Sequence, residues 1–361
     1  MLFIGIMSGT STDGVDAALC RIHASDQLEV IHHYSEPFDA ALRAEILQLN
    51  QSGVDELHRA ALVSNQLADC YAHCTQQLLL HAQVPSSAIT AIGVHGQTVR
   101  HAPHLGYTIQ LNAPARLAEL TKIHVVADFR SKDIAAGGQG APLVPVFHQA
   151  VFGAPTPRVI LNLGGIANIS ILRPQHAPTG FDTGPANALM DAWIQKHQAC
   201  RFDQNGAWAA QGTPDPTLLQ TLLVEPWLAL PPPKSTGRDL FNLRWLESHL
   251  QGTALAPVDV QATLACFTAT TVAQAIHQHA ADATEIILCG GGAYNTHLRQ
   301  QLVTQIKKPI RLSDELGIGA QCVEAAAFAW LAYAYWQDIP AGQPSITGAN
   351  HPSILGAWHK A

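Results

Sequence analysis

Small, hydroxyl-bearing and acidic residues gather in one short segment close to the N-terminus. The segment reads Met7-Ser8-Gly9-Thr10-Ser11-Thr12-Asp13-Gly14-Val15-Asp16 and separates two apolar runs. Its glycines and hydroxyls allow backbone N–H groups to approach an oxyanion, and its aspartates suit Mg²⁺ held through water. An ordinary hairpin turn explains the same residues, because Asp13-Gly14 is a strong turn signal. No Walker A motif occurs, and no GxGxxG opens a first βαβ unit, so neither of those nucleotide sites is expected.

Two later glycine-bearing segments are candidate partners of this turn. The turn Asn162-Leu163-Gly164-Gly165-Ile166-Ala167-Asn168 would serve as a second phosphate clamp, although a glycine pair alone usually indicates a tight turn. Gly290-Gly291-Gly292 follows an expected strand and precedes an expected helix. Three glycines there allow close backbone approach to a planar ring such as adenine.

Asp182 is a candidate general base. It lies in Gly180-Phe181-Asp182-Thr183-Gly184-Pro185, directly before an expected helix in which Pro185 would occupy the first turn. Asp182 or Thr183 would cap this helix, or Asp182 would take a proton within a cleft. The residues by themselves leave both interpretations open.

Glu324 is a second candidate acid, in the last predicted helix. The residues that share its helical face are otherwise apolar: Ala320, Phe328, Leu331 and Tyr335. A buried carboxylate is costly unless it is protonated, paired or facing a polar ligand. We favour a ligand cleft over a buried ion pair.

Polar side chains also follow two predicted strands. His95, Gln97 and Thr98 come after one, and Asp128 and Arg130 come after the other. Such strand ends commonly hold substrate hydroxyls, and an arginine there suits a carboxylate-bearing substrate. Structural salt bridges are the alternative interpretation of these residues.

The expected elements repeat one pattern in the two halves of the chain. Strands are expected at 2–7, 15–23, 28–34, 91–95, 107–111, 125–128, 158–163, 166–172 and 285–289. Helices are expected at 39–50, 55–81, 114–121, 186–198, 258–281, from about 296, and at 320–337. Each half begins with a hairpin whose turn carries glycine and small polar residues. This repeat predicts two duplicated α/β domains facing each other across a cleft.

The domain boundaries follow from a connector rich in glycine and proline near 137–142. The N-terminal lobe is predicted to hold residues 1–130 and 340–361, and the C-terminal lobe residues 131–339. An insertion is expected around 200–257, and Leu230-Pro231-Pro232-Pro233-Lys234 reads as a loop within it.

Composition excludes several classes of protein. Apolar residues make up 47% of the 361 residues, charged residues 13%, and the net charge is −7, so a large core is expected and wholesale disorder is not. No Lys/Arg cluster indicates nucleic-acid binding, and no membrane span or signal peptide is expected. Seven cysteines without framework spacing favour a reducing compartment, so a cytoplasmic location is predicted.

These segments together resemble one family along essentially the whole chain. The match begins at 7–16 and continues through Gly93-Val94-His95-Gly96-Gln97-Thr98, Asp128-Phe129-Arg130 and 133–145. It also includes 162–168, 180–185, Gly290-Gly291-Gly292-Ala293-Tyr294-Asn295 and 324–331. The sequence is thus similar to the anhydro-N-acetylmuramic acid kinases. Ala186 departs from the glycine that often follows the proline in that family.

The resemblance implies an acetate and sugar kinase/Hsp70/actin-like (ribonuclease H-like) fold with a central cleft, and a homodimer. It implies hydrolytic cleavage of the 1,6-anhydro bridge and phosphorylation of O6 with ATP and Mg²⁺, in peptidoglycan recycling. Asp182 would be the catalytic base and Glu324 would bind sugar or place the attacking water. The residues expected at the nucleotide are Ser8, Gly9, Thr10, Ser11, Thr12, Asp13, Gly14, Val15, Asp16, Asn162, Gly164, Gly165, Asn168, Gly290, Gly291, Gly292 and Asn295. Those expected at the sugar are His95, Gln97, Thr98, Asp128 and Arg130, and no side chain is expected to ligate metal directly.

Two other functions compete with this one. A plain sugar kinase of the same fold would phosphorylate a free hydroxyl without hydrolysis. A non-catalytic, nucleotide-dependent sugar sensor would need no base, so Asp182 and Glu324 disfavour it.

Overall fold

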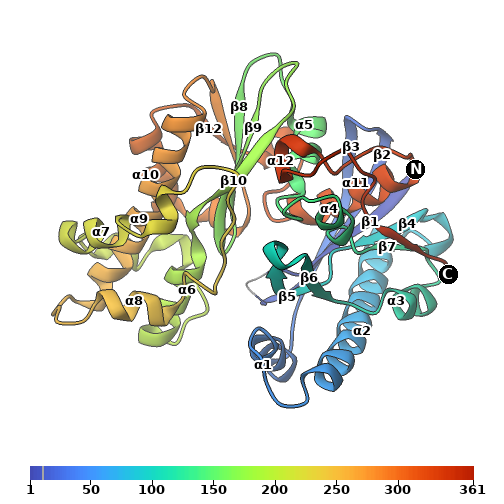
Figure 1. Cartoon of the computed structure of the whole chain (residues 1–361), viewed down its shortest axis with the longest axis horizontal. Helices are drawn as coiled ribbons and strands as arrows, with labels where there is room; N and C mark the ends of the chain where they lie inside the picture. The colour runs from blue at the N-terminus through green and yellow to red at the C-terminus, as the bar shows by residue number, and fades with distance from the viewer. Residues whose placement is uncertain (10–11) are drawn as a thin grey trace. The chain divides into compact units, whose positions relative to one another are not determined.

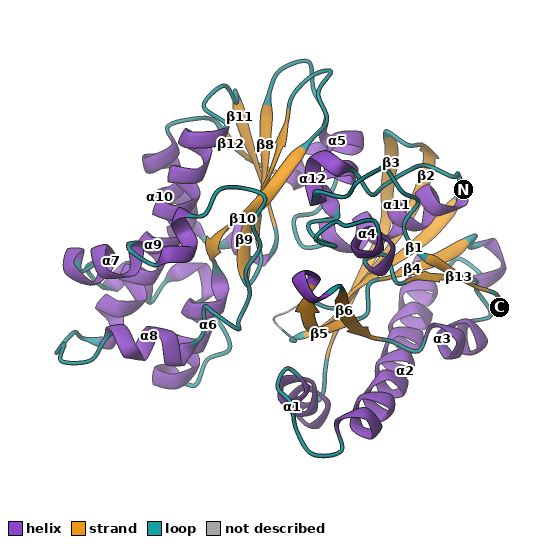
Figure 2. Cartoon of the chain, in the orientation of Figure 1, coloured by secondary structure: helices purple, strands orange, loops and turns teal. Residues whose placement is uncertain are grey.

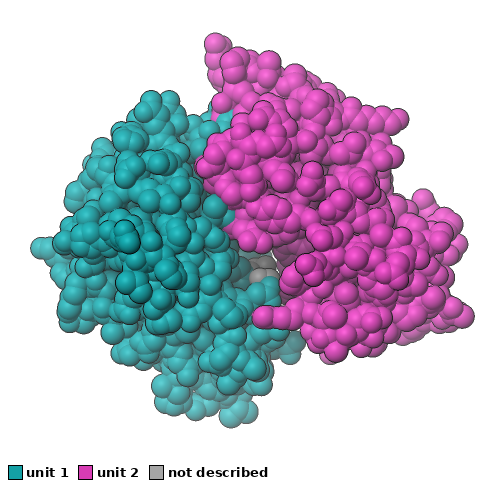
Figure 3. Space-filling model, turned by 180° about the vertical axis from the view of Figure 1, so that it is seen from behind, with its two compact units in different colours: residues 1–152, 322–361 teal, residues 153–321 magenta. Residues whose placement is uncertain are grey.

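The computed structural model describes residues 1–9 and 12–361, and the chain divides into two compact units. Unit 1 comprises residues 1–152 and 322–361, and unit 2 comprises residues 153–321 (Figure 3). Within this described part of the chain, no helix has the length and apolar character needed to cross a membrane.

Unit 1 is built on a six-stranded sheet in the order β13-β7-β4-β1-β2-β3 (Figure 1). Its strands are β1 Leu2–Met7, β2 Gly14–Ala24, β3 Gln27–Pro37, β4 Ala91–Val94, β7 Val125–Ala127 and β13 Ala357–His359. A separate hairpin pairs β5 Gln97–Ala102 with β6 Tyr107–Leu111. The helices are α1 Ala40–Leu49, α2 Glu56–Ala82, α3 Pro114–Thr121, α4 Ser131–Ala135, α5 Val144–Phe152, α11 Val323–Trp336 and α12 Pro344–Thr347.

Helices cover both faces of this sheet, because alternate side chains along a strand point to opposite faces. Ile4 and Ile6 of β1 belong to a core that includes Leu67 of α2. Phe3 and Gly5 face α11 instead. The Phe3 and Tyr333 rings lie 5.8 Å apart, and a Cβ built on Gly5 would lie 1.8 Å from the Ala325 carbonyl oxygen. Glycine in β1 therefore lets the α11 backbone lie directly on the sheet.

Unit 2 is built on a five-stranded sheet in the order β10-β9-β8-β11-β12 (Figure 2). Its strands are β8 Arg158–Leu163, β9 Ile166–Leu172, β10 Thr179–Pro185, β11 Glu285–Cys289 and β12 Ile310–Leu312. The helices are α6 Asn187–Gln198, α7 Pro216–Leu223, α8 Leu243–His249, α9 Pro257–His279 and α10 Thr296–Ile306. The long helix α9 packs against β10, α6, α7 and α10.

The two sheets share one topology. In each unit the first three strands of the sheet form an antiparallel meander, a fourth strand pairs parallel to the first, and a fifth pairs parallel to the fourth. The order of these five strands is 3-2-1-4-5 in both units, and β13 is an addition in unit 1. The repeat expected from the two hairpin-led halves is therefore present in the strand order.

The unit boundaries differ from the predicted ones at 130/131 and 339/340. The division falls at 152/153 and 321/322 because α4, α5 and α11 belong to unit 1. Helix α11 packs on β1, β2 and β4, and α5 packs on α11 through Phe147 and Trp330, whose rings are 6.3 Å apart. The glycine-rich connector was a misleading signal, since it links two segments of the same unit.

A buried histidine of α5 predicts a pH dependence of stability. His148 is 1% exposed beside Phe147, and burial lowers its pKa to about 3. An unfolded histidine has a pKa near 6.5, so between about pH 6.5 and 3 only the unfolded chain takes up this proton. The folded pKa is the lower one, so the contribution of His148 to stability is complete above pH 6.5. It falls by about 1.4 kcal/mol per pH unit as the pH drops.

Between pH 6 and 4 the free energy of unfolding should therefore change less steeply with pH in His148→Gln than in wild type. We expect the slope to differ by the equivalent of about one bound proton. Urea titrations at a series of pH values measure this slope. The exposed His176, changed to glutamine, serves as the control and should leave the slope unchanged. Equal slopes in wild type and His148→Gln would contradict the prediction.

Candidate active site

The first glycine-bearing segment leads from β1 to β2 in unit 1. Ser8 is buried, and its hydroxyl donates to the Gly96 carbonyl at 3.1 Å and lies 2.7 Å from the Tyr71 hydroxyl. This hydroxyl therefore has a structural role. Thr12 adopts a positive φ and its N–H donates to the Gly9 carbonyl. The predicted positions Thr10 and Ser11 lie outside the described residues.

The end of this segment enters β2. A Cβ on Gly14 would lie 2.2 Å from the Glu36 carbonyl oxygen, so only glycine fits beside β3. The Val15 side chain belongs to the hydrophobic core, so its predicted nucleotide contact would come from its backbone. Asp13 and Asp16 both keep partly exposed carboxylates. The Asp13 carboxylate lies 3.4 Å from the Arg43 guanidinium, and the Asp16 carboxylate accepts from the Ser35 hydroxyl at 2.5 Å.

His95 and Arg130 are brought together from the ends of β4 and β7. Arg130 Nε and Nη2 lie 3.0 and 2.9 Å from His95 Nε2, and Nη1 donates to the Gly140 carbonyl at 2.6 Å. Burial holds the pKa of His95 well below its usual value, and the Arg130 charge adds to this shift. Because arginine only donates, the imidazole is neutral with Nε2 as an acceptor.

Gln97 follows His95 and lies fully buried in β5. Its Nε2 donates to the Gly9 carbonyl at 3.1 Å, whereas Oε1 has no partner among residues 1–9 and 12–361. Asn112 was missed by the sequence analysis, yet both polar atoms of its buried amide lack partners within the same residues. Its Cβ lies 3.2 Å from the position of a Cβ built on Gly96. Buried amide atoms without a partner among the described residues are positions where a polar ligand or an ordered water can bind.

Thr98 and Asp128 have local roles. Thr98 Oγ1 accepts from Gln110 across the β5–β6 hairpin at 3.1 Å. Asp128 adopts a positive φ, is exposed, and accepts from the Ser131 N–H at 3.3 Å, at the start of α4. Neither contact involves the His95–Arg130 pair.

Glu324 lies in the first turn of α11, at the loop end of the sheet. The His95 ring packs 4.9 Å from that of Phe328, one turn further along the helix. The helix was expected to have one apolar face that includes Ala320. Ala320 instead precedes α11, and residues on nearly all sides of α11 are buried. Glu324 is half-buried at a helix N-terminus, where the helix dipole favours an anion.

A row of polar residues crosses the sheet of unit 2. Asp182 of β10 pairs with Asn168 of β9, Asn168 with Asn162 of β8, and Asn162 with Cys289 of β11. Strands lie about 4.8 Å apart, so the row spans about 15 Å. It ends at Cys289, immediately before Gly290. The tertiary structure thus places the predicted base and both glycine segments along one line of the sheet.

The prediction that Asp182 or Thr183 caps the following helix, with Pro185 in its first turn, is wrong. These residues form β10, α6 begins at Asn187, and its N-cap Ala186 makes no side-chain capping bond. Asp182 therefore caps no helix. Its Oδ2 accepts from the Thr236 N–H at 2.9 Å.

The turn at Gly164-Gly165 is held by a residue that the sequence analysis did not single out. Asn187 Nδ2 donates to the carbonyls of Leu163 and Gly164 at 3.0 and 2.9 Å. The Asn187 N–H also donates to the Gly164 carbonyl. This asparagine joins the β8–β9 turn to α6. Its place at the start of a helix was the signal available in the sequence.

The three consecutive glycines have different surroundings. Gly290 has φ of 81°, and a Cβ there would lie 2.4 Å from Asn162 Oδ1. A Cβ on Gly292 would lie 2.8 Å from Leu163 Cβ, whereas Gly291 has open space around it. Asn295 caps α10 by accepting from the Leu298 N–H at 3.0 Å, which gives this predicted nucleotide residue a structural role.

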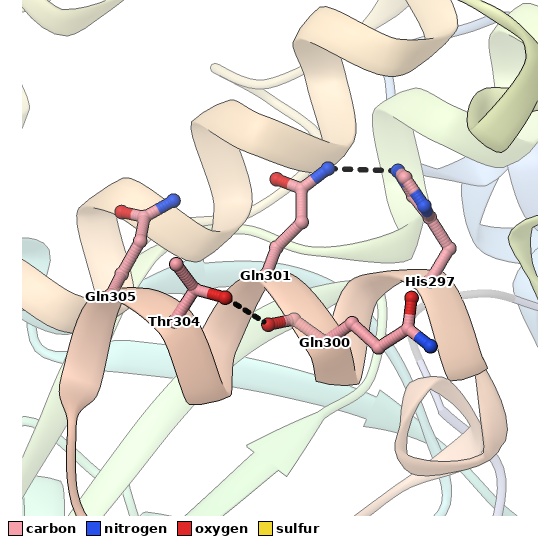
Figure 4. Close-up of a pocket in the computed structure, with 5 residues that line it drawn as sticks. All are labelled: His297, Gln300, Gln301, Thr304 and Gln305. Atoms are coloured by element: carbon pink, nitrogen blue, oxygen red, sulfur yellow. Dashed lines mark hydrogen bonds between the residues drawn. The ribbon is translucent and has the colours of Figure 1, made fainter.

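A surface pocket of unit 2 lies on one face of α10, away from these residues. His297, Gln300, Gln301, Thr304 and Gln305 line it, and His297 and Gln301 hydrogen bond at 2.8 Å (Figure 4). None of the predicted site residues lines it.

Comparison with known proteins gives the family. The family model of anhydro-N-acetylmuramic acid kinase matches residues 1–361. The chain is 57% identical to the anhydro-N-acetylmuramic acid kinase of Bordetella petrii, over 100% of this chain and 96% of that protein. It is 50% identical to the enzyme of Neisseria meningitidis serogroup B, over 99% of this chain and 98% of that one. The chain belongs to the anhydro-N-acetylmuramic acid kinase family.

This membership makes the chain a phosphotransferase of amino-sugar metabolism, and the predicted family is confirmed. The family's reaction converts anhydro-N-acetylmuramic acid to N-acetylmuramic acid 6-phosphate in peptidoglycan recycling. Among solved structures, component A of (R)-2-hydroxyglutaryl-CoA dehydratase from Acidaminococcus fermentans aligns with a TM-score of 0.51 at 10% identity, covering 95% of this chain and all of that one. The predicted two-domain actin/Hsp70/sugar kinase fold is confirmed.

Proposed function

We propose that this chain carries out its family's reaction as an ATP-dependent hydrolytic kinase, with Asp182 as the general base. The observation that carries this proposal is the row from Asp182 through Asn168 and Asn162 to Cys289 and Gly290. It sets a carboxylate and the candidate nucleotide-binding turns on one sheet of one unit.

The proposed chemistry begins at water. Asp182 takes a proton from the water whose oxygen attacks the anomeric carbon of the bicyclic sugar. The bond from that carbon to O6 breaks, and O6 keeps the electron pair. O6 then attacks the γ-phosphorus of ATP, and ADP leaves. Phosphoryl transfer depends mainly on positioning and charge neutralisation, which the backbone N–H groups of the glycine turns are suited to provide.

The glycines of unit 2 fit a nucleotide. Gly291 is open on the side where a Cβ would stand, and Gly290 holds the loop in a conformation that only glycine adopts easily. We assign the adenosine to Gly290–Gly292 and the phosphates to Gly164, Gly165 and Asn168 of the same unit.

The carboxylates of Asp13 and Asp16 remain partly exposed, so they are suited to a magnesium ion that keeps its waters. Mg²⁺ usually keeps several waters and takes one or two carboxylates together with substrate phosphates. When bound, Mg²⁺ neutralises charge on the phosphate oxygens. Asp13 and Asp16 would hold the ion through its waters.

We propose that polar groups of unit 1 bind the sugar. Gln97 Oε1, which has no partner among residues 1–9 and 12–361, would accept from a sugar hydroxyl or amide. The neutral His95 would be held in orientation by Arg130. We assign Arg130 to the lactyl carboxylate, Thr98 and Asp128 to the rim of this site, and Glu324 to the sugar or the attacking water.

One substitution tests the nucleotide assignment. We expect Gly291→Val to raise the KM for ATP about tenfold with an unchanged Tm, because the new side chain meets only open space in the protein and fills the nucleotide's place. Steady-state kinetics against ATP and a thermal melt measure both quantities. The KM for the sugar serves as the internal control. An unchanged KM for ATP would remove Gly291 from the nucleotide site.

Isotope labelling tests the reaction itself. The purified chain is incubated with anhydro-N-acetylmuramic acid and ATP in ¹⁸O-water, and the product mass is measured. We expect one solvent oxygen at the anomeric carbon and one phosphoryl group per product molecule. A phosphorylated product without ¹⁸O indicates a plain sugar kinase, and sugar binding without ATP turnover indicates a sensor.

We also propose a cytoplasmic homodimer, as the family resemblance implies. The seven cysteines are free thiols, which suits a reducing compartment that supplies ATP. Light scattering after size exclusion should give twice the chain mass of 38.6 kDa. A mass of one chain at micromolar concentration would overturn the dimer.

A further inference from the structure

The segment 225–236, which we name the clasp, lies along β10 at Asp182. The Asp182 N–H donates to the Lys234 carbonyl at 3.1 Å, and the Thr236 N–H donates to Asp182 Oδ2 at 2.9 Å. Leu228 packs next to Gly184 of the same strand, 3.4 Å from the position of a Cβ there. The clasp therefore contacts both the backbone and the carboxylate of the candidate base.

Internal bonds hold the clasp in shape. Trp227 Nε1 donates to the Ser235 carbonyl at 3.1 Å, so the tryptophan joins the two ends of the proline-rich loop. Glu225 accepts from the Trp227 N–H at 3.3 Å and from Trp245 Nε1 of α8 at 2.9 Å. The position of Lys234 is thus set by the fold of unit 2.

The Lys234 side chain carries a positive charge that is held within the clasp. Its Nζ donates to the Leu228 carbonyl at 2.7 Å and lies 4.5 Å from the centroid of the Trp227 ring. Burial lowers the pKa of Lys234, and the charge of Asp182 opposes that shift. His279 of α9 also faces this region: its ring packs 5.0 Å from that of Phe181, and its pKa is lowered by burial and then by Lys234.

We propose that Lys234 and the Thr236 N–H are positioning groups for Asp182. The N–H fixes Oδ2, and the ammonium charge favours the ionised carboxylate that a general base requires. This inference rests on the proposed role of Asp182. It gives the proline-rich insertion a role in positioning the base, whereas the sequence alone indicated only a loop.

The test is the pH profile of kcat/KM for Lys234→Met, with Lys234→Arg as the matched control. In Lys234→Met the acid limb should move up by about one pH unit, because the carboxylate loses a stabilising cation. Arginine keeps the charge and stacks on tryptophan, so in Lys234→Arg the limb should stay near its wild-type position. The KM for ATP should be unchanged in both variants.

An unmoved acid limb in an active Lys234→Met would overturn the proposal. A raised KM for the sugar with an unmoved limb would assign Lys234 to substrate binding instead. Thr236→Pro removes the N–H and should lower kcat at least tenfold, whereas Thr236→Ala retains the N–H and should not. Failure of the base assignment is separate, since it appears as near-normal turnover in Asp182→Asn.

Discussion

Replacing Asp182 with asparagine is expected to lower kcat by about 10²–10⁴ while the affinities for ATP and sugar stay nearly unchanged. Asparagine has the shape of aspartate and still accepts from the Thr236 N–H, so the clasp contact survives. It cannot take a proton from water at neutral pH, so only the chemical step suffers. A discontinuous assay of product formation measures kcat, and isothermal titration calorimetry measures the affinity for each ligand.

The matched control is Asp282→Asn in the same unit. Asp282 forms a surface ion pair with Arg173 at 2.7 Å, and exposed pairs contribute little. This variant should retain wild-type kcat. If Asp182→Asn also turns over at a near-normal rate, Asp182 is not the base, and the hydrolytic mechanism loses its central residue.

Replacing Gly5 with valine is expected to remove about 3 kcal/mol or more of folding free energy. A Cβ at this position would lie 1.8 Å from the Ala325 carbonyl oxygen and 2.4 Å from the Ala329 nitrogen. Both are backbone atoms of α11, so no side-chain rotation relieves the clash and the helix must move off the sheet. Because Glu324 lies in the first turn of α11, the folded fraction should also lose activity.

Urea denaturation followed by circular dichroism measures this loss as a lower midpoint. Gly53→Ala is the control: its Cβ would meet only the end of the Arg59 side chain, at 3.4 Å, and its midpoint should change little. A wild-type midpoint for Gly5→Val would show that β1 and α11 can separate at no cost.

The repeated hairpin was readable from the sequence because strand and turn signals are local. Alternating apolar runs and the Asp13-Gly14 and Gly164-Gly165 turns are properties of a few neighbouring residues. The strand β10 was not readable in the same way. Gly180, Gly184 and Pro185 are poor strand formers, and only pairing with β9 makes this segment a strand.

The packing of α11 on the sheet of unit 1 was also not predictable from local sequence. Residues 323–336 are far along the chain from β1, and no local pattern indicates which sheet they cover. The absence of Cβ atoms at Gly5 and Gly93 decides it, because it leaves room for the backbone of one helix. The boundary of unit 1 follows from this packing rather than from the flexible-looking connector at 137–142.

The amino-acid sequence alone therefore determined the family, the doubled α/β topology and the residues with the required chemistry, since these depend on residue type and short-range order. The fold of unit 2 was needed to show that Asp182 lies on a strand in the same row as Asn168, Asn162 and Cys289, and that Lys234 and Thr236 contact it. Strand register and loop packing join residues tens of positions apart, and such contacts are fixed by the burial and hydrogen bonding of the whole unit.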